Sequence, residues 1–370
     1  MRQGGKFTKQ SVAASGHVPG PLIFLVDDVD PTKGIERFPS VPRFADGYTV
    51  LQNRPGMLVE MHMLKDYRTR VTGNYEILRA LLEVMNRDAD KLVRLDRDAD
   101  AAVVAAGKRY DPNAKFPLRT APSKETEPFL YHTFKYVREL SGVSGQIWIK
   151  YTHEPLDLSI PHAARLDVTM GVVPPRAYLV PAQWSKIIAV LETQGLRLER
   201  TVRPWSGEVD TYRCSDLKWN EKSFEGHHVM FSPQFTAHPF SGRCTPVHEK
   251  LSFPAGSVVV PMDQRAAKVA LEWLEPEAPD SAVAWGYFDA VFEQKEWGED
   301  YVVEKLARDM MAKDPKLREE FEQRLAADKQ FAADPKARLD FFYRRSPWWD
   351  RELGLYPVGR LTALEDVPLK

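Results

Sequence analysis

The segment Met57–Leu64 places one carboxylate inside an otherwise apolar run, and this combination limits what the chain can fold into. In a β-strand the side chains alternate between two faces, so Glu60 would share its face with Leu58 and His62. A glutamate in a buried strand is costly unless it is paired, protonated or used in chemistry. The run therefore predicts a buried strand in which Glu60 is either a structural carboxylate, held by an arginine or by His62, or a catalytic group.

The first 108 residues are expected to contain a second strand and a long helix. Leu22–Val26 is purely apolar and predicts a short buried strand, of the kind found in parallel or mixed sheets with helices on both faces. From Asn74 onward, apolar residues recur every three or four positions and predict a helix. Further along, Asp88–Asp100 lacks the turn of a calcium loop and predicts a solvated helix face. The apolar stripe of the helix consists of Tyr75, Leu78, Leu82 and Met85.

Prolines between residues 109 and 125 predict a linker, followed by a β-rich accessory domain over 126–270 and a helical region over 271–370. Within the accessory domain a helix is expected over Ala182–Thr193, with Gly195 suited to its C-terminal cap. Alternating apolar residues predict strands at Gln146–Thr152, Leu156–Ile160 and Leu196–Arg200.

The helical region carries two Asp-Pro pairs that suit helix starts. Asp314 and Asp334 each precede a proline, so each can cap a helix whose first turn contains that proline. Near the end of the chain, five aromatic side chains can either pack the tail onto the body or form a platform for a sugar or a peptide. They are Phe341, Phe342, Tyr343, Trp348 and Trp349.

Composition excludes several classes of partner. The 51 basic and 52 acidic residues give a net charge of −1, which offers no field for nucleic acid or an anionic membrane. The apolar run Leu22–Val26 is too short to span a bilayer, and no apolar region of a secretory signal follows Met1, which favours the cytoplasm by default. The only two cysteines, Cys214 and Cys244, are compatible with a disulfide or with free thiols.

One group of potential metal ligands lies in the accessory domain. Its spacing matches neither a zinc finger nor a zinc knuckle, so packing is the favoured interpretation and a structural zinc the alternative. No Gly-x-Ser-x-Gly elbow, phosphate-binding glycine loop or dinucleotide fingerprint is present in the sequence. The group consists of His227, His228, His238, Cys244 and His248.

The segment Pro39–Tyr48, followed by the strand-like run around Glu60, resembles the end of a bacterial zinc carboxypeptidase catalytic domain. In that family, which is carboxypeptidase A-like, a late strand carries the glutamate that activates zinc-bound water. The resemblance therefore implies that Glu60 is the general base of a peptide hydrolase, with Tyr48 and His62 as candidate pocket-lining residues.

Three later segments resemble the C-terminal extension of large members of the same family. They are Phe253–Pro261, Leu274–Ser281 and Phe341–Pro347. The implied fold class is an α/β remnant of a carboxypeptidase-like mixed sheet with helices over residues 1–108, then a β-rich α+β domain, then a helical region.

The zinc ligands of the family have no counterpart here. Members use a His-x-x-Glu pair and a later histidine upstream of the base, whereas only His17 precedes Glu60, and no histidine in the chain has a glutamate three residues later. The resemblance thus implies zinc and a peptide substrate, but the chain is expected to hold no stoichiometric zinc and to be truncated and inactive alone. A non-catalytic module that binds a peptide or a partner, and a gene fragment without a function of its own, are the alternatives. Family parents are commonly exported, and oligomeric state is left open.

Overall fold

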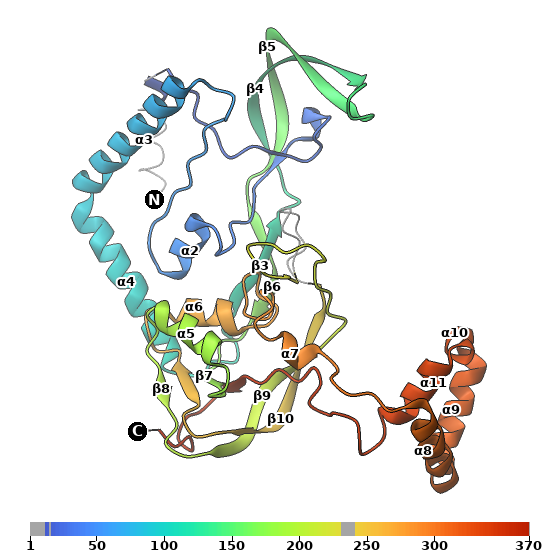
Figure 1. Cartoon of the computed structure of the whole chain (residues 1–370). Helices are drawn as coiled ribbons and strands as arrows, with labels where there is room; N and C mark the ends of the chain where they lie inside the picture. The colour runs from blue at the N-terminus through green and yellow to red at the C-terminus, as the bar shows by residue number, and fades with distance from the viewer. Residues whose placement is uncertain (1–11, 15, 231–240, 370) are drawn as a thin grey trace.

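The structure, a computed structural model, describes residues 12–14, 16–230 and 241–369 and combines helices with three β-sheets (Figure 1). The central body is built on a six-stranded sheet in the order β10-β9-β12-β7-β11-β8, in which every neighbouring pair is antiparallel. Its strands are β7 (Ala177–Val180), β8 (Glu199–Arg200), β9 (Trp205–Ser215), β10 (Arg243–Phe253), β11 (Val258–Pro261) and β12 (Gly359–Leu361).

Both faces of this sheet are covered, which is why β7 and β11 are apolar at every position. All four residues of each strand are buried. Because side chains alternate along a strand, Tyr178 and Val180 belong to the larger core, whereas Ala177 and Leu179 belong to the smaller core on the other face. The larger core also contains buried residues of α5 (Ser185–Thr193) and α6 (Ala267–Leu274), and a short helix, α7 (Asp289–Phe292), follows.

Helix α5 confirms the helix expected over Ala182–Thr193. It ends at Thr193, and Gly195 has a positive φ of 76°, the left-handed conformation expected of a glycine just after a helix. The strand expected at Leu196–Arg200 is much shorter, since only Glu199 and Arg200 pair with β11.

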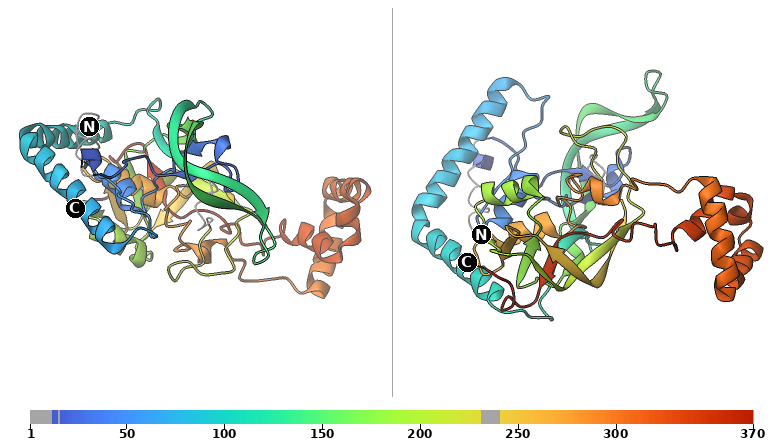
Figure 2. Two further views of the ribbon diagram at one scale, coloured as in Figure 1. Left: turned by 90° about the horizontal axis from the view of Figure 1, so that it is seen from above. Right: turned by 60° about the horizontal axis from the view of Figure 1, so that its bottom comes forward.

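A long two-stranded ribbon rises from the body (Figures 1 and 2). It consists of β4 (Glu127–Leu140) and β5 (Ile147–Ala163). The two strands expected at Gln146–Thr152 and Leu156–Ile160 are parts of the single strand β5, which begins at Ile147. At its base β5 pairs in parallel with β2 (Ile35–Glu36). The remaining strands of the two smaller sheets are β1 (Phe24–Leu25), β3 (Phe116–Pro122) and β6 (Leu166–Val172). A 3-10 helix, η1 (Pro31–Lys33), lies between β1 and β2.

Residues 109–125, expected as a linker, contain β3. This strand pairs with β6 from Phe116 to Pro122, so the segment belongs to a sheet. Prolines are tolerated here because β3 has one partner strand and therefore an edge that needs no backbone donor.

The first part of the chain supplies the helices α2 (Ala45–Leu51), α3 (Tyr67–Arg87) and α4 (Ala89–Gly107). The helix expected from Asn74 is therefore confirmed, but it begins earlier, where Asp66 caps the Thr69 amide. Its apolar stripe is exposed along its whole length, at Tyr75, Leu78, Leu82 and Met85. Within the described residues, no helix is long and apolar enough to cross a membrane.

Both buried strands expected in this region are wrong. Met57–Leu64 is an extended loop without strand pairing, and Met63 and Leu64 are 78% and 81% exposed. Of Leu22–Val26 only Phe24 and Leu25 form a strand, and its single partner is the two-residue β2. The apolar pattern is present in the sequence, but Met57–Leu64 has no neighbouring strand among the described residues, and β1 pairs with β2 over two residues only.

Four helices near the C-terminus form a bundle that stands apart from the six-stranded sheet (Figure 2). They are α8 (Asp300–Lys313), α9 (Pro315–Ala327), α10 (Lys329–Ala333) and α11 (Pro335–Tyr343). Asp314 and Asp334 cap α9 and α11, with proline in the first turn of each, as the sequence predicts. Of the aromatic group, Phe341 and Phe342 fill the core of the bundle with Phe321, so they pack the bundle itself instead of tying it to the body.

Candidate functional site

Glu60 lies on the exposed loop between α2 and α3. Among the described residues, its carboxylate has neither a hydrogen bond nor an ion pair, so the prediction of a buried carboxylate is wrong. His62 is exposed on the same loop, and its Nδ1 accepts a hydrogen bond from the Leu64 amide at 3.2 Å. The loop thus presents both side chains to solvent and leaves them unconstrained by the body.

Tyr48 points in another direction. It lies on α2, where its hydroxyl donates to Gln194 Oε1 just after α5 and accepts from Gln52 Nε2 at 2.8 Å. No contact described in the structure joins Tyr48 to Glu60 or His62. The three residues singled out in the sequence are therefore not gathered into one pocket by this chain.

The histidines and cysteine considered as zinc ligands are used elsewhere. Cys244 forms a disulfide with Cys214, its direct partner across β9 and β10. His227 stacks on Tyr287, and His248 contacts Asp210 through Nδ1 at 2.9 Å. His228 Nδ1 lies 3.0 Å from the Asn220 carbonyl, and His238 lies outside the described residues.

The residues present do not fit a zinc centre. In the part of the chain that the structure describes, no three His, Cys, Asp or Glu side chains come together as a metal site. The disulfide removes the one thiolate pair, and Glu60 and His62 have no third donor beside them. A hydrolytic zinc ion needs three protein ligands, and the residues that the structure describes do not bring three together.

A different cluster of functional groups is buried behind α6. The segment Leu274–Ser281 folds as a tight turn, and acidic side chains from this turn and from the helix before it enter the interior. Carboxylates are rarely buried without partners, and each of these has its own. The buried acids are Glu272, Glu275, Glu277 and Asp280.

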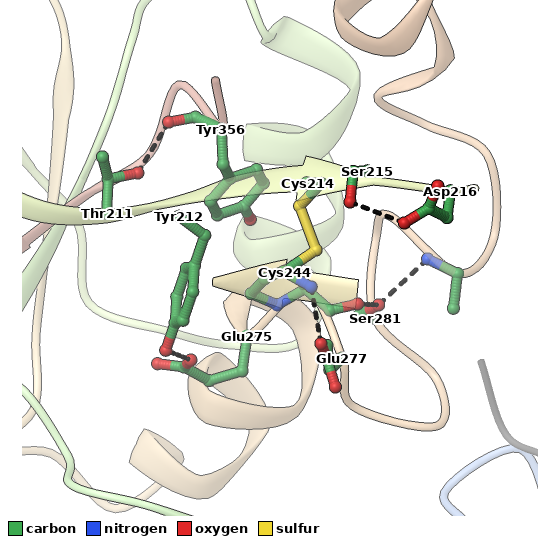
Figure 3. The surroundings of a disulfide bond; sticks show 12 residues. Thr211, Tyr212, Cys214, Ser215, Asp216, Cys244, Glu275, Glu277, Ser281 and Tyr356 are labelled. Atoms are coloured by element: carbon green, nitrogen blue, oxygen red, sulfur yellow. Dashed lines mark hydrogen bonds between the residues drawn. A yellow bond between two sulfur atoms is a disulfide. The ribbon is translucent and has the colours of Figure 1, made fainter. Parts of the chain in front are cut away.

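Glu275 is held by two tyrosines and one arginine. Tyr212 donates to its Oε2 at 2.5 Å, Tyr178 donates to its Oε1, and Arg360 Nε lies 3.0 Å from Oε1 (Figure 3 shows the Tyr212 contact). Burial, and then the adjacent Glu275, raise the pKa values of Tyr178 and Tyr212, so both phenols remain hydrogen-bond donors. This network ties α6 to β7, β9 and β12.

Glu277 joins the disulfide to the small β3–β6 sheet. Its Oε1 accepts from the Cys244 amide at 2.6 Å (Figure 3), and its Oε2 lies 3.0 Å from Arg119 Nη2 on β3. Arg119 also donates to the Glu277 carbonyl at 2.7 Å. One acidic side chain therefore connects two sheets that share no strand pairing.

Glu272 is a buried carboxyl group whose pKa lies far above its ordinary value. Burial raises its pKa to about 8, against a hydrogen bond from the Asp280 amide to Oε1 at 3.0 Å that favours the charged form. Near neutral pH the group is therefore mostly protonated. Burial also raises the pKa of Asp280, although Arg43 opposes this shift.

Asp280 binds Arg43, which lies in the segment that precedes Glu60 in the sequence. Arg43 Nε lies 2.8 Å from Asp280 Oδ1, and the Arg43 amide donates to Oδ2 at 2.8 Å. The residues involved are 237 positions apart in the chain. Two segments that the sequence separately marks as family-like, Pro39–Tyr48 and Leu274–Ser281, thus meet in the interior.

Sequence reasoning did not assign these buried acids a role. Glutamate and aspartate are mostly surface residues, so a run with four of them within nine positions suggests solvent exposure. The available signal was the apolar and aromatic context, since Trp273, Leu274 and Trp285 surround the turn in the sequence.

Over about a third of its length the chain is similar to fungal proteins named carboxypeptidase 2. It is 28% identical to carboxypeptidase 2 of Trichophyton tonsurans over 132 residues, which are 36% of this chain and 22% of that protein. For carboxypeptidase 2 of Trichophyton rubrum the identity is 29% over 112 residues, or 30% of this chain and 19% of that protein. The chain thus spans about a fifth of the length of these relatives.

These relatives are fungal and give no support to the expected bacterial branch. No protein-family model matches the chain, and no solved structure matches it either.

Proposed function

We propose that this chain is part of a carboxypeptidase-like peptidase in which Glu60 is the proton-accepting carboxylate. The metal ligands, and the remainder of the substrate site, would come from residues outside this chain. Similarity to proteins named carboxypeptidase 2 supports the peptidase class.

The observation that carries the proposal is the contact between Arg43 and Asp280. A chance resemblance of two short segments gives no reason for them to touch. Here they form a buried ion pair across 237 positions, which is what two parts of one inherited architecture would do.

The exposed apolar surface around Glu60 adds support. Met57, Met63 and Leu64 are exposed on the loop, and the apolar stripe of α3, the next helix in the chain, is exposed as well. Exposed apolar patches larger than a few hundred Å² are uncommon on soluble monomers and usually mark an interaction site. A catalytic portion that packs against this surface would bury it and would surround Glu60 with a substrate site.

The first test is to sequence the genomic DNA and the transcript on both sides of the coding region for this chain. We expect a reading frame, joined or adjacent, that encodes a His-x-x-Glu pair and a later histidine. An unrelated neighbourhood without such a frame would contradict the proposal.

The second test uses the polypeptide that contains this frame, assayed on peptides with a free C-terminus. Glu60→Gln should lower kcat by about 10² to 10⁴, the usual contribution of a general base. The exposed Glu322 on α9 provides the matched control, and Glu322→Gln should leave kcat unchanged. Full activity of Glu60→Gln would refute the assignment, and this chain alone is expected to hydrolyse no peptide.

A second candidate function is a non-catalytic module that binds an extended peptide along the ribbon. The observation that favours it is that β4 is the edge strand of its sheet, and that Leu140 and Trp148 near the ribbon tip are exposed. Edge strands accept peptides by strand addition. Fluorescence anisotropy with labelled extended apolar peptides tests this, and binding should fall at least tenfold in Trp148→Ala.

A further inference from the structure

The Arg43 side chain is enclosed by the turn Leu274–Ser281, which we call the acidic turn. Besides the ion pair with Asp280, Arg43 Nη2 donates to the Pro279 carbonyl at 3.0 Å, and the guanidinium lies 5.7 Å from the centre of the Trp285 ring. Trp285 Nε1 in turn donates to Asp280 Oδ1 at 3.1 Å. The side chains of Arg43 and Asp280 are only 16% and 8% exposed.

This geometry requires arginine. The planar guanidinium contacts a carboxylate, a carbonyl and a ring face at once, whereas a lysine ammonium is a single point charge that cannot make all three contacts. The Arg43 amide adds a further bond to the same carboxylate, so the backbone at the start of α2 is fixed together with the side chain.

The other end of α2 is fixed to the body as well. Leu51 is buried in the larger core, and Arg265 Nη1 donates to Gln52 Oε1 at 2.7 Å. Arg54 then forms an ion pair with Asp100 of α4 at 2.8 Å. The chain is therefore anchored from residue 43 to residue 54, and the loop that carries Glu60 starts directly after the last anchor.

We propose that Arg43 is a positioning residue, which holds α2 in the acidic turn and thereby sets where the Glu60 loop leaves the body. This inference rests on the proposed function for its catalytic meaning, because Glu60 is the group being positioned. The acidic turn, which is far away in the sequence, then binds the segment that precedes the catalytic carboxylate.

The test is hydrogen–deuterium exchange of the full chain, followed by mass spectrometry, for wild type, Arg43→Lys and Asp280→Asn. Both variants should exchange at least tenfold faster in peptides covering Ala45–Leu51. Protection of β7 and β11 should stay within twofold of wild type. The control is Arg37→Lys, since Arg37 is exposed six residues earlier, and its exchange should match wild type throughout.

Equal protection of α2 in wild type and both variants would overturn the proposal. So would a uniform rise over the whole body, because that is the signature of a structural residue without a positioning role. If Asp280→Asn does not fold, Arg43→Lys and the weaker change Trp285→Phe still give the comparison.

The exchange experiment needs no peptidase activity, so it can succeed or fail independently of the proposed function. In an active longer polypeptide, Arg43→Lys should lower kcat at least tenfold with KM and metal content unchanged. If α2 exchanges faster in Arg43→Lys but the longer polypeptide has no peptidase activity, the inference about Arg43 stands and the enzyme assignment is refuted.

Discussion

Replacing Glu272 by glutamine should remove a pH dependence that is built into the body of the protein. Glu272 is buried, receives a hydrogen bond from the Asp280 amide, and faces the side chains of Asp280, Arg43 and Arg119. Its pKa is raised by burial from 4.5 to about 8. Glutamine has the shape of the protonated carboxyl group and can keep its Oε1 as the acceptor for the Asp280 amide.

The direction of this pH dependence follows from the linkage between proton binding and folding. The folded state holds the proton of Glu272 more tightly than the unfolded state, so the stabilising contribution is complete below pH 4.5 and is lost as the pH rises towards 8. At about 1.4 kcal/mol per pKa unit, the full effect is about 5 kcal/mol. Relative to wild type, Glu272→Gln should therefore gain about 1 kcal/mol of stability at pH 5 and about 4 kcal/mol at pH 8.

The assay is urea unfolding of both proteins, followed by tryptophan fluorescence, at four pH values from 5 to 8.5. The control is Glu192→Gln on α5, whose exposed ion pair with Arg200 should contribute less than about 1 kcal/mol at every pH. A stability difference between wild type and Glu272→Gln that does not grow with pH would refute the reasoning.

Three further predictions concern stability, and each is measured by denaturant unfolding. Arg360→Met leaves a buried carboxylate without its cation and should destabilise the body by about 3–5 kcal/mol, whereas Arg200→Met, which breaks an exposed pair, should cost less than about 1 kcal/mol; equal costs would contradict the account of this network. Replacing both Cys214 and Cys244 by serine opens a loop with a sequence separation of 30 and should cost about 3–4 kcal/mol, an effect that reduction of the wild type should reproduce. Asp314→Ala removes a cap that accepts hydrogen bonds from two amides of α9 and should destabilise the bundle by about 1 kcal/mol. The six-stranded body should keep its stability, and a loss there would argue against an independent bundle.

The sequence predicted the elements that depend on neighbouring residues alone. Asp314 and Asp334 cap their helices because the cap, the proline and the first turn lie within four residues of one another. The end of α5 near Gly195 is equally local, since a glycine supplies the left-handed conformation at that point.

The predictions that were wrong concern residues whose conformation depends on partners far away in the sequence. The alternation in Met57–Leu64 specifies two faces, but a strand also needs a neighbour for its backbone, and none of the described strands pairs with it. The buried acids were missed for the same reason, because the partners of Asp280 and Glu275 include Arg43 and Arg360, which lie far away in sequence.

The position of β12 has a consequence for synthesis of the protein. This strand contains the residues Gly359–Leu361 and lies between β7 and β9, so it is inserted into the middle of the sheet although it is synthesised after the other five strands of that sheet. The bundle α8–α11 is made before it and can fold while β7 and β9 still expose open edges. A nascent chain that stalls between Tyr343 and Gly359 would therefore display a finished bundle attached to an unfinished, aggregation-prone sheet.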